Sequence, residues 1–281
     1  MTKLRFAPSP SGRLHLGHAY SALFTWREAE RLGGEVLLRI EDIDHTRCRA
    51  EHIAGIEEDL AWLSLSWPTP VRRQSDYLPD YAQRLEQLKS MGVVYPCFCT
   101  RAEIRAEIER SAGAPHGSEG PLYPGTCRDL PKAEADKRIA NGDSHAWRIN
   151  LAKALSALPD GAELSWHDLT AGKVEALPEL LGDAVLARKD IGTSYHMAVV
   201  HDDALQGITH VTRGKDLWDA THLHVLLQKL LDLPTPLYHH HDLVTDEDGQ
   251  RLATRDQART LLSMRENGVS LSDLQQMLAG F

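Results

Sequence analysis

Two short apolar runs with a helical stretch between them mark the start of the chain. Residues 4–7 form the first run, and residues 19–32, after a turn rich in proline and glycine, carry apolar residues at helical spacing. Gly33 and Gly34 end this helix, and residues 36–40 form a nearly continuous apolar run of buried-strand length. This order predicts a βαβ unit, whose ligands bind at the carboxyl ends of its parallel strands.

The pattern changes between about residues 96 and 182, where glycine, proline and scattered charges interrupt the periodicity. We expect an inserted smaller domain there. Short apolar runs return at residues 185–187, 197–200 and 208–211, and they are predicted to complete the parallel sheet. A long helical pattern over residues 217–231 follows them.

The predicted fold is therefore α/β, with a Rossmann-like, doubly wound parallel sheet, an inserted domain and a short helical C-terminal part. Residues 1–95 and 183–235 are predicted to form the two halves of the nucleotide-binding α/β domain. Residues 96–182 form the insertion, and residues 236–281 form a loop followed by two helices separated by Asn267-Gly268.

Composition narrows the class of protein. A chain of 281 residues with 42% hydrophobic content can bury a sizeable core. No signal peptide and no run of about 18 apolar residues occurs, so we expect a soluble, cytoplasmic protein with no membrane partner.

The net charge of −9 does not indicate a nucleic-acid binder, because such proteins usually carry a basic excess. A local basic patch would have to bind RNA. Arg27, Arg31, Arg72 and Arg73 are candidates for such a patch, and a solvated helix face is the alternative interpretation.

Three of the four cysteines lie close together in the sequence, with a tyrosine between them. Cys97, Cys99, Tyr123 and Cys127 offer three thiolates and a phenol. Spacing alone leaves zinc binding and unligated buried cysteines as alternatives, since zinc usually takes four Cys or His ligands. Cys48 stands apart and is interpreted as structural.

Consecutive histidines at positions 239–241 form a second candidate metal group. Successive side chains of an extended chain point in different directions, which makes a shared site awkward. We interpret these residues as part of a loop or strand.

A third group of candidate residues follows the first turn. His15 and His18 open the predicted helix, so both imidazoles lie near a positive helix end that favours phosphate oxygens. Gly17 lets a nucleotide approach the backbone closely. Neither G-x-G-x-x-G nor a Walker motif is present, which argues against dehydrogenases and P-loop enzymes.

Residues 5–18 as a whole resemble the first signature of class I aminoacyl-tRNA synthetases, in the form found in glutamyl-tRNA synthetases. Residues 202–216 again resemble the glutamyl enzymes, and Tyr195 precedes them at the family's spacing. The resemblance implies an ATP site with His15, Gly17 and His18, and a glutamate pocket formed by Arg5, Phe6, Ala7, Pro8, Ser9, Glu41, Tyr195 and Arg213. Guanidinium groups suit the two carboxylates of glutamate, and Glu41 suits its ammonium group.

The third signature of the class normally places lysines beside the ATP phosphates. Arg251 and Thr254 stand at the lysine positions here, and Arg255 follows one place later. Arg251 and Arg255 are expected to bring cations to the phosphates, with Thr254 beside them. The departure leaves a weakly active or non-catalytic binding paralogue as an alternative.

The resemblance extends from Arg5 to about Ala258, and the chain stops at Phe281 without the further anticodon-binding region of ordinary glutamyl-tRNA synthetases. This shorter form, with its Cys/Tyr cluster, resembles the glutamyl-Q tRNA(Asp) synthetases. That family implies activation of L-glutamate with ATP and Mg²⁺, one Zn²⁺ bound by Cys97, Cys99, Tyr123 and Cys127, and transfer of glutamate to queuosine in the anticodon loop of tRNA(Asp). A compact glutamyl-tRNA synthetase that charges tRNA(Glu) is the alternative, and the protein is expected to be a monomer.

Overall fold

The computed structural model describes residues 1–110, 116–117, 120–244 and 260–279. Its first elements are β1 (Lys3–Phe6), α1 (Leu16–Arg31) and β2 (Glu35–Ile40). The two strands pair in parallel, with Leu4 opposite Val36. The predicted βαβ unit is therefore confirmed.

Four more strands extend this parallel arrangement. They are β3 (Arg72–Arg73), β8 (Ser165–Asp168), β11 (His210–Gly214) and β12 (Leu237–His241). β3 pairs with β2, and β12 pairs in parallel with both β11 and β8. β11 approaches β1, where the backbone N–H of Thr209 donates to the carbonyl oxygen of Lys3 at 3.0 Å. β12 contains the three consecutive histidines, which confirms their interpretation as strand residues.

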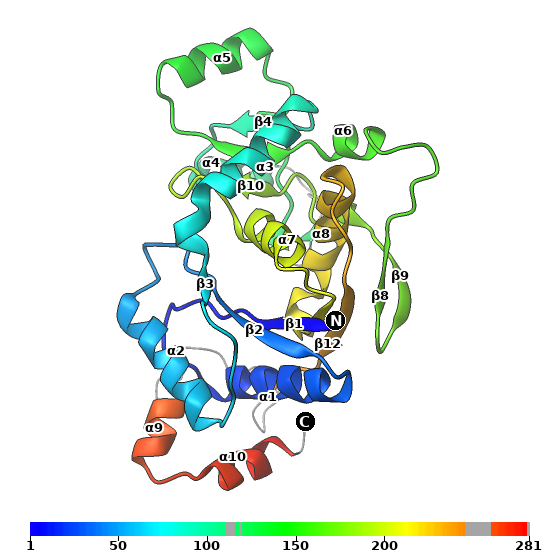
Figure 1. Cartoon of the computed structure of the whole chain (residues 1–281). Helices are drawn as coiled ribbons and strands as arrows, with labels where there is room; N and C mark the ends of the chain where they lie inside the picture. Colours follow the sequence, from blue (N-terminus) through cyan, green and yellow to red (C-terminus); the bar gives the residue numbers. More distant parts are fainter. Residues whose placement is uncertain (111–115, 118–119, 245–259, 280–281) are drawn as a thin grey trace.

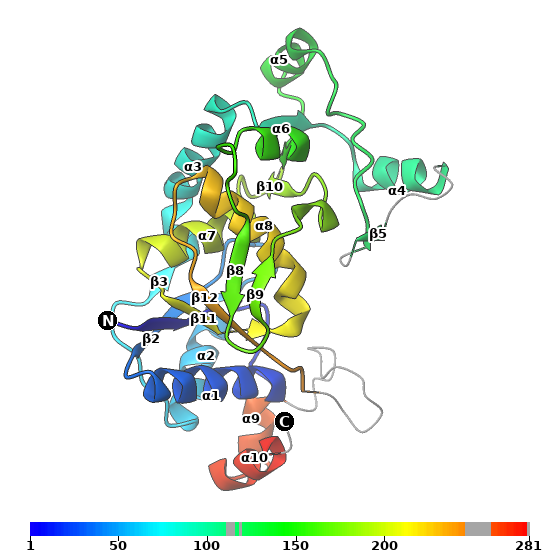
Figure 2. The same cartoon turned by 90° about the vertical axis from the view of Figure 1, so that its right-hand side faces the viewer.

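Helices lie on both sides of these strands (Figures 1 and 2). On one side are α1 and α2 (Ala50–Trp62), and on the other are α7 (Tyr195–Leu205) and α8 (Trp218–Leu230). The C-terminal helices α9 (Leu261–Glu266) and α10 (Leu271–Leu278) share a hydrophobic core with α1. None of the described helices is long and apolar enough to cross a membrane.

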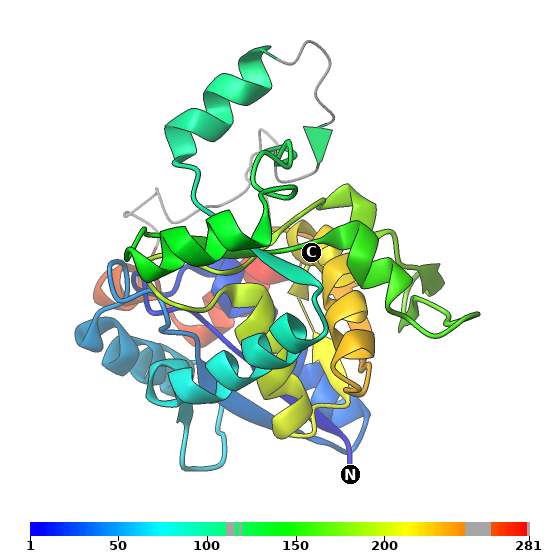
Figure 3. The same ribbon diagram turned by 90° about the horizontal axis from the view of Figure 1, so that it is seen from above.

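A smaller antiparallel sheet lies at the other end of the molecule, in the order β10-β7-β4. The remaining α-helices and strands are α3 (Leu78–Ser90), β4 (Val94–Cys97), α4 (Arg101–Arg110), β5 (His116–Gly117), β6 (Gly120–Pro121), α5 (Lys132–Ala140), β7 (Ala146–Ile149), α6 (Leu151–Ser156), β9 (Gly172–Glu175) and β10 (Val185–Ala187). α4 projects from the body of the molecule, as Figures 2 and 3 show from two sides. The predicted boundaries of the four sequence segments stay a prediction.

Two of the apolar runs assigned to the parallel sheet were interpreted wrongly. Residues 185–187 do form β10, but β10 pairs antiparallel with β7. Residues 197–200 lie in α7, where Ser194 caps the helix by accepting a hydrogen bond from the backbone N–H of Met197. Because α7 packs between other elements, all four side chains are buried, and a short run buried on every side has no period that separates a helix from a strand.

Asp202 on α7 joins three segments through buried hydrogen bonds. Its carboxylate is fully buried and accepts from Arg72 Nε at 2.8 Å, Gln74 Nε2 at 2.9 Å and Tyr81 Oη at 2.9 Å. Arg72 is thus part of an internal ion pair, because its side chain is only 11% exposed. This position belongs to the core and not to the basic surface patch considered for RNA.

Replacing Asp202 with alanine is therefore expected to destabilise the protein by about 3 to 5 kcal/mol, since Arg72 keeps a buried charge without its main partner. Urea unfolding measures the change. Asp80→Ala is the matched control, because Asp80 also contacts Arg72, at 3.3 Å, but is 42% exposed. Its loss should cost at most about 1 kcal/mol. Equal effects of the two variants would contradict the assignment.

Candidate active site

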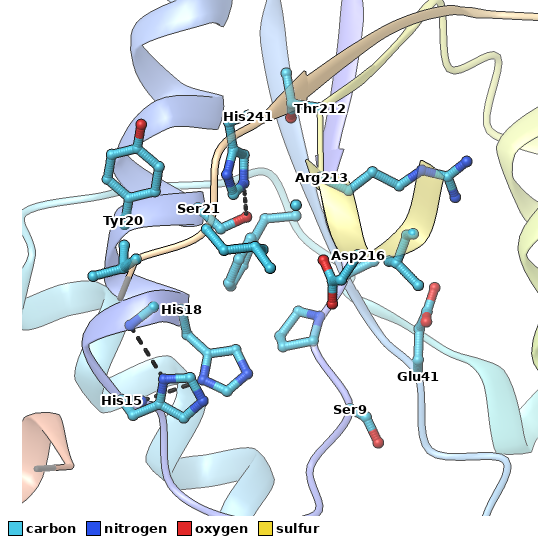
Figure 4. A pocket seen from close by; sticks show the side chains of 18 of the residues that line it. Ser9, His15, His18, Tyr20, Ser21, Glu41, Thr212, Arg213, Asp216 and His241 are labelled. Carbon is cyan, nitrogen blue, oxygen red and sulfur yellow. Dashed lines mark hydrogen bonds between the residues drawn. The ribbon is translucent and has the colours of Figure 1, made fainter. Parts of the chain in front are cut away.

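A cavity of about 570 Å³ opens where β1, β2 and β11 end and α1 begins (Figure 4). Its wall contains every residue predicted for the glutamate pocket and three of those predicted for ATP: Arg5, Phe6, Ala7, Pro8, Ser9, His15, Gly17, His18, Glu41, Tyr195 and Arg213. Arg5 on β1 and Arg213 on β11 are far apart in the sequence and meet here because parallel strands end at one edge of the sheet. The structure brings these residues together, and their individual roles stay predictions.

His15 and His18 form the start of α1. Nδ1 of His15 accepts from the backbone N–H of Gly17 at 3.1 Å, and Nδ1 of His18 accepts from the backbone N–H of His15 at 3.2 Å. A neutral imidazole that accepts at Nδ1 carries its proton on Nε2. Each ring therefore presents an Nε2–H donor at a helix N-terminus, which suits the oxygens of a phosphate chain.

Arg251, Thr254 and Arg255 lie outside the described residues. The residues on either side of that segment are described, and both lie at the cavity. Val244 lines it, and Thr260 forms a β-bridge with His15.

A buried ion-pair network lies below Arg5 and Glu41. Asp203 accepts from Nε of Arg5 at 3.1 Å and from Nη1 of Arg39 at 2.8 Å, and Nη2 of Arg39 donates to Glu41 at 3.1 Å. Burial acts to raise the pKa of Asp203, but Arg5 and Arg39 outweigh it and lower that pKa. Burial raises the pKa of Glu41 against the pull of Arg39 and Arg5. The ionised carboxylate of Asp203 is therefore stabilised by Arg5 and Arg39, whereas the ionised carboxylate of Glu41 is stabilised less.

Arg213 differs from the buried Arg5 and Arg39, because all of its hydrogen-bond partners among the described residues are uncharged. It is 5% exposed and contacts the hydroxyls of Tyr195 at 3.2 Å and Thr221 at 2.8 Å, and the imidazoles of His240 at 3.3 Å and His224 at 3.4 Å. No carboxylate of the described chain lies within ion-pair distance of it.

The histidines around Arg213 are neutral at physiological pH. Burial, and then the charge of Arg213, lower the pKa of His240 to about 4 and that of His224 well below its usual value. The guanidinium therefore has no direct counter-ion among the described residues, and the buried carboxylate of Asp168 reaches it only through His240, whose Nδ1 it contacts at 2.8 Å. A buried cation without a counter-ion is costly, so the site is built for an anionic ligand.

The cavity thus has two chemically different ends. Figure 4 shows His15 and His18 at one end, and Arg213 and Glu41 at the other. The first end offers donors at a helix terminus, whereas the second offers a cation and an anion. A ligand that carries both charges, placed next to a phosphate chain, matches this arrangement.

Cys97, Cys99, Tyr123 and Cys127 meet at the end of β4, a strand of the smaller antiparallel sheet. The three sulfur atoms lie within 4.8 Å of one another, with Sγ of Cys99 at 3.4 Å from that of Cys127. The phenol oxygen of Tyr123 lies 3.4 Å from Sγ of Cys97 and 3.5 Å from Sγ of Cys99. A tetrahedral zinc site with bonds of about 2.3 Å has edges of about 3.8 Å, so these four atoms fit such an ion.

The sequence does not predict the buried residues that form hydrogen bonds to the side chains of the pocket wall. The sequence places Arg39 in an apolar strand and Asp203 in the segment that resembles glutamyl-tRNA synthetases, and neither residue is predicted to contribute to the site. A charged residue inside a buried run is a usable signal, because it requires buried partners of opposite charge. The hydroxyl of Thr221 and the imidazole of His224 gave no such signal, because uncharged polar residues are common in helices and the burial of nearly the whole of α8 appears only in the structure.

Comparison with known proteins shows one family that matches nearly the whole chain. The family of class I tRNA synthetases (E and Q), catalytic domain, matches residues 1–278. A glutamyl-Q tRNA(Asp) synthetase of Rhodobacter capsulatus is 46% identical over 277 residues, which are 98% of each chain. One from Symbiobacterium thermophilum is 44% identical over 95% of this chain and 82% of its own length.

A solved structure agrees with the sequence relatives. The glutamate tRNA ligase of Elizabethkingia meningosepticum, in complex with its amino acid, superposes with a TM-score of 0.74 and 30% identity over 91% of this chain. The match covers 52% of that ligase, so this chain spans about half its length. With the class I catalytic domain and close full-length relatives, the chain belongs to the glutamyl-Q tRNA(Asp) synthetase family of ligases.

Proposed function

We propose that the protein activates L-glutamate with ATP and transfers it to queuosine in the anticodon loop of tRNA(Asp), without charging tRNA(Glu). The observation that carries the glutamate assignment is the buried guanidinium of Arg213, which has no direct carboxylate partner among the described residues and shares a cavity with the carboxylate of Glu41. The names of the relatives support the choice of tRNA.

Glutamate fits the cavity in one direction. Its α-carboxylate reacts with ATP, so it faces the end with His15 and His18. The γ-carboxylate then reaches Arg213, which offers a planar fork that matches it, and the ammonium group pairs with Glu41. Arg5 uses two of its N–H groups on Asp203 and on the carbonyl oxygen of Thr212, and it contributes mainly positive potential.

Activation needs positioning and charge stabilisation more than covalent catalysis. An oxygen of the α-carboxylate attacks the α-phosphorus of ATP in line, the bond to the β-phosphate oxygen breaks, and pyrophosphate leaves with the electron pair. The Nε2–H groups of His15 and His18 stabilise the charge that develops on the phosphate oxygens. Mg²⁺, when bound with the nucleotide, neutralises part of that charge.

Arg251, Thr254 and Arg255 complete this proposal. The described residues that flank this segment support the proposal, because Val244 lines the cavity and Thr260 forms a β-bridge with His15. Arg251, at the first lysine position, and Arg255, one place after Thr254 at the second, would replace the point charge of a lysine with a planar fork.

In the second step a hydroxyl oxygen of queuosine attacks the carbonyl carbon of glutamyl-adenylate. An ester bond forms, the bond between the carbonyl carbon and the phosphate oxygen breaks, and AMP leaves with the electron pair. The hydroxyl proton is released to water. The mixed anhydride already contains a good leaving group, so the main requirement is to position the hydroxyl.

Zinc is part of the proposal and gives a separate prediction. Cys97→Ser is expected to reduce the zinc content of the purified protein from about one per chain to well below one, because a hydroxyl replaces one of three thiolates. Metal analysis by mass spectrometry measures it. Cys48→Ser is the control and should keep its zinc, since Cys48 lies near Ser9 and outside the cluster. Equal zinc in both variants would contradict the site.

The proposed activity is tested in two assays. Pyrophosphate exchange with ATP should depend on L-glutamate, proceed without tRNA, and be weak with L-glutamine or L-aspartate. Labelled glutamate should then appear in tRNA(Asp) that carries queuosine, and not in queuosine-free tRNA(Asp) or in tRNA(Glu). Label in tRNA(Glu) would indicate a compact glutamyl-tRNA synthetase, and absence of exchange would indicate a binding paralogue.

A further inference from the structure

A second cavity, of about 430 Å³, adjoins the first. Tyr195 lines both cavities. The second cavity lies between the zinc-site region and the start of α7, and its wall includes Leu122, Tyr123, Arg148, Leu181 and His196. The activation step described above uses none of these five residues.

Arg148 forms a flat cationic surface in this wall. Its guanidinium carbon lies 3.9 Å from the centre of the Tyr123 ring, and its Nη1 donates to the carbonyl oxygen of Asp183 at 2.8 Å. Its Nε atom is buried and has no hydrogen-bond partner in the described part of the chain. A planar guanidinium is suited to nucleobases, which arginine recognises by stacking and by hydrogen bonds to exocyclic carbonyl oxygens and ring nitrogens.

A chain of hydrogen bonds connects the two cavities. Arginine only donates, so Arg213 donates to Nδ1 of His224 at 3.4 Å and places the proton of that ring on Nε2. Nε2 of His224 then donates to Nδ1 of His196 at 3.1 Å, which leaves the proton of His196 on its Nε2. His196 therefore contributes a second donor group to the wall of the second cavity, in a fixed tautomer.

We infer that the second cavity receives the base of queuosine, with Arg148 as its main recognition residue and Leu122 and Leu181 as its apolar wall. This inference rests on the proposed function. The base is flat and purine-like and carries a ring with hydroxyl groups. With the base in this cavity, those hydroxyls point past Tyr195 toward the carbonyl carbon of glutamyl-adenylate in the first cavity.

The position of Tyr123 supports this assignment. The phenol oxygen lies among the three sulfur atoms, while the face of the same ring holds the guanidinium of Arg148. A cysteine ligand would offer no ring face at this position. The unusual tyrosine thus couples the zinc-site geometry to the wall of the second cavity.

The test compares two leucine variants in the full-length protein. Leu181→Trp fills the second cavity without removing a hydrogen bond. Leu177→Trp is the matched control, because Leu177 lies four residues earlier, is 48% exposed and does not line the cavity. We expect Leu181→Trp to keep glutamate-dependent pyrophosphate exchange and to lower kcat/KM for queuosine-bearing tRNA(Asp) by about tenfold or more, as for loss of a base-stacking site.

Arg148→Met provides a second measurement, with the same expected separation of exchange from transfer. Parental transfer by Leu181→Trp and Arg148→Met, or an equal loss of exchange and transfer, would overturn the inference alone. If the unaltered protein performs exchange but transfers no glutamate to queuosine-bearing tRNA(Asp), the proposed function fails, and the inference fails with it.

Discussion

Replacing Arg213 with leucine should lower kcat/KM for glutamate by about a thousandfold in pyrophosphate exchange. The buried guanidinium has only uncharged partners, so its loss leaves the γ-carboxylate of the substrate in a buried place without a cation. Removing one partner of such a pair costs about 2 to 5 kcal/mol, and a thousandfold change corresponds to about 4 kcal/mol. Initial rates at varied glutamate concentration measure the effect.

Arg213→Lys serves as the matched control, because it keeps the charge and loses the planar fork. Its kcat/KM should fall between those of the parent and the leucine variant. The apparent affinity for ATP should be similar in all three proteins, since His15 and His18 lie at the opposite end of the cavity. Parental use of glutamate by the leucine variant would show that Arg213 does not bind the substrate.

Glu41→Gln should lower the same constant by about a hundredfold, because the amide cannot neutralise the ammonium group of glutamate. The pH dependence gives a second signature. Burial raises the pKa of Glu41 above its usual value near 4.5. As the pH falls through this raised pKa, the group becomes neutral, and kcat/KM of the parent should fall. The variant should lack this acid limb.

Stability separates this functional loss from unfolding. Because the pKa of Glu41 is higher in the folded chain, protonation favours folding, and this contribution is lost as the pH rises through the folded pKa. At pH 7 the ionised carboxylate therefore costs folding free energy. Glu41→Gln should accordingly keep a melting temperature at least equal to that of the parent. A lower melting temperature together with unchanged glutamate use would contradict the role of Glu41.

Much of the fold was predictable where the pattern was strongly periodic. The first βαβ unit, the helix near residues 217–231 and the C-terminal helix pair follow from spacing and from glycine or asparagine breaks. Residues 197–200 were misread because a helix packed on every side shows no polar face. The sequence also does not show which strand pairs with β10, because strand pairing depends on contacts with residues far from 185–187 in the sequence.

The candidate site was predictable to a similar degree. A family signature located the residues that face the cavity, and the structure then brought residues from four strands and helices to one place. The support behind them, from Arg39 and Asp203, depends on contacts between residues 164 positions apart, which a single sequence does not reveal. The neutral histidines around Arg213 likewise follow from burial, a property of the fold.

The attachment point of the glutamate is the most direct test of the account. Queuosine-bearing tRNA(Asp) is incubated with the protein, glutamate, ATP and Mg²⁺, cut with a guanosine-specific ribonuclease, and analysed by mass spectrometry. The account predicts that the anticodon-loop fragment gains the mass of one glutamyl group and that the 3′-terminal fragment does not change. A glutamyl group on the 3′-terminal fragment, with an unchanged anticodon fragment, would contradict it.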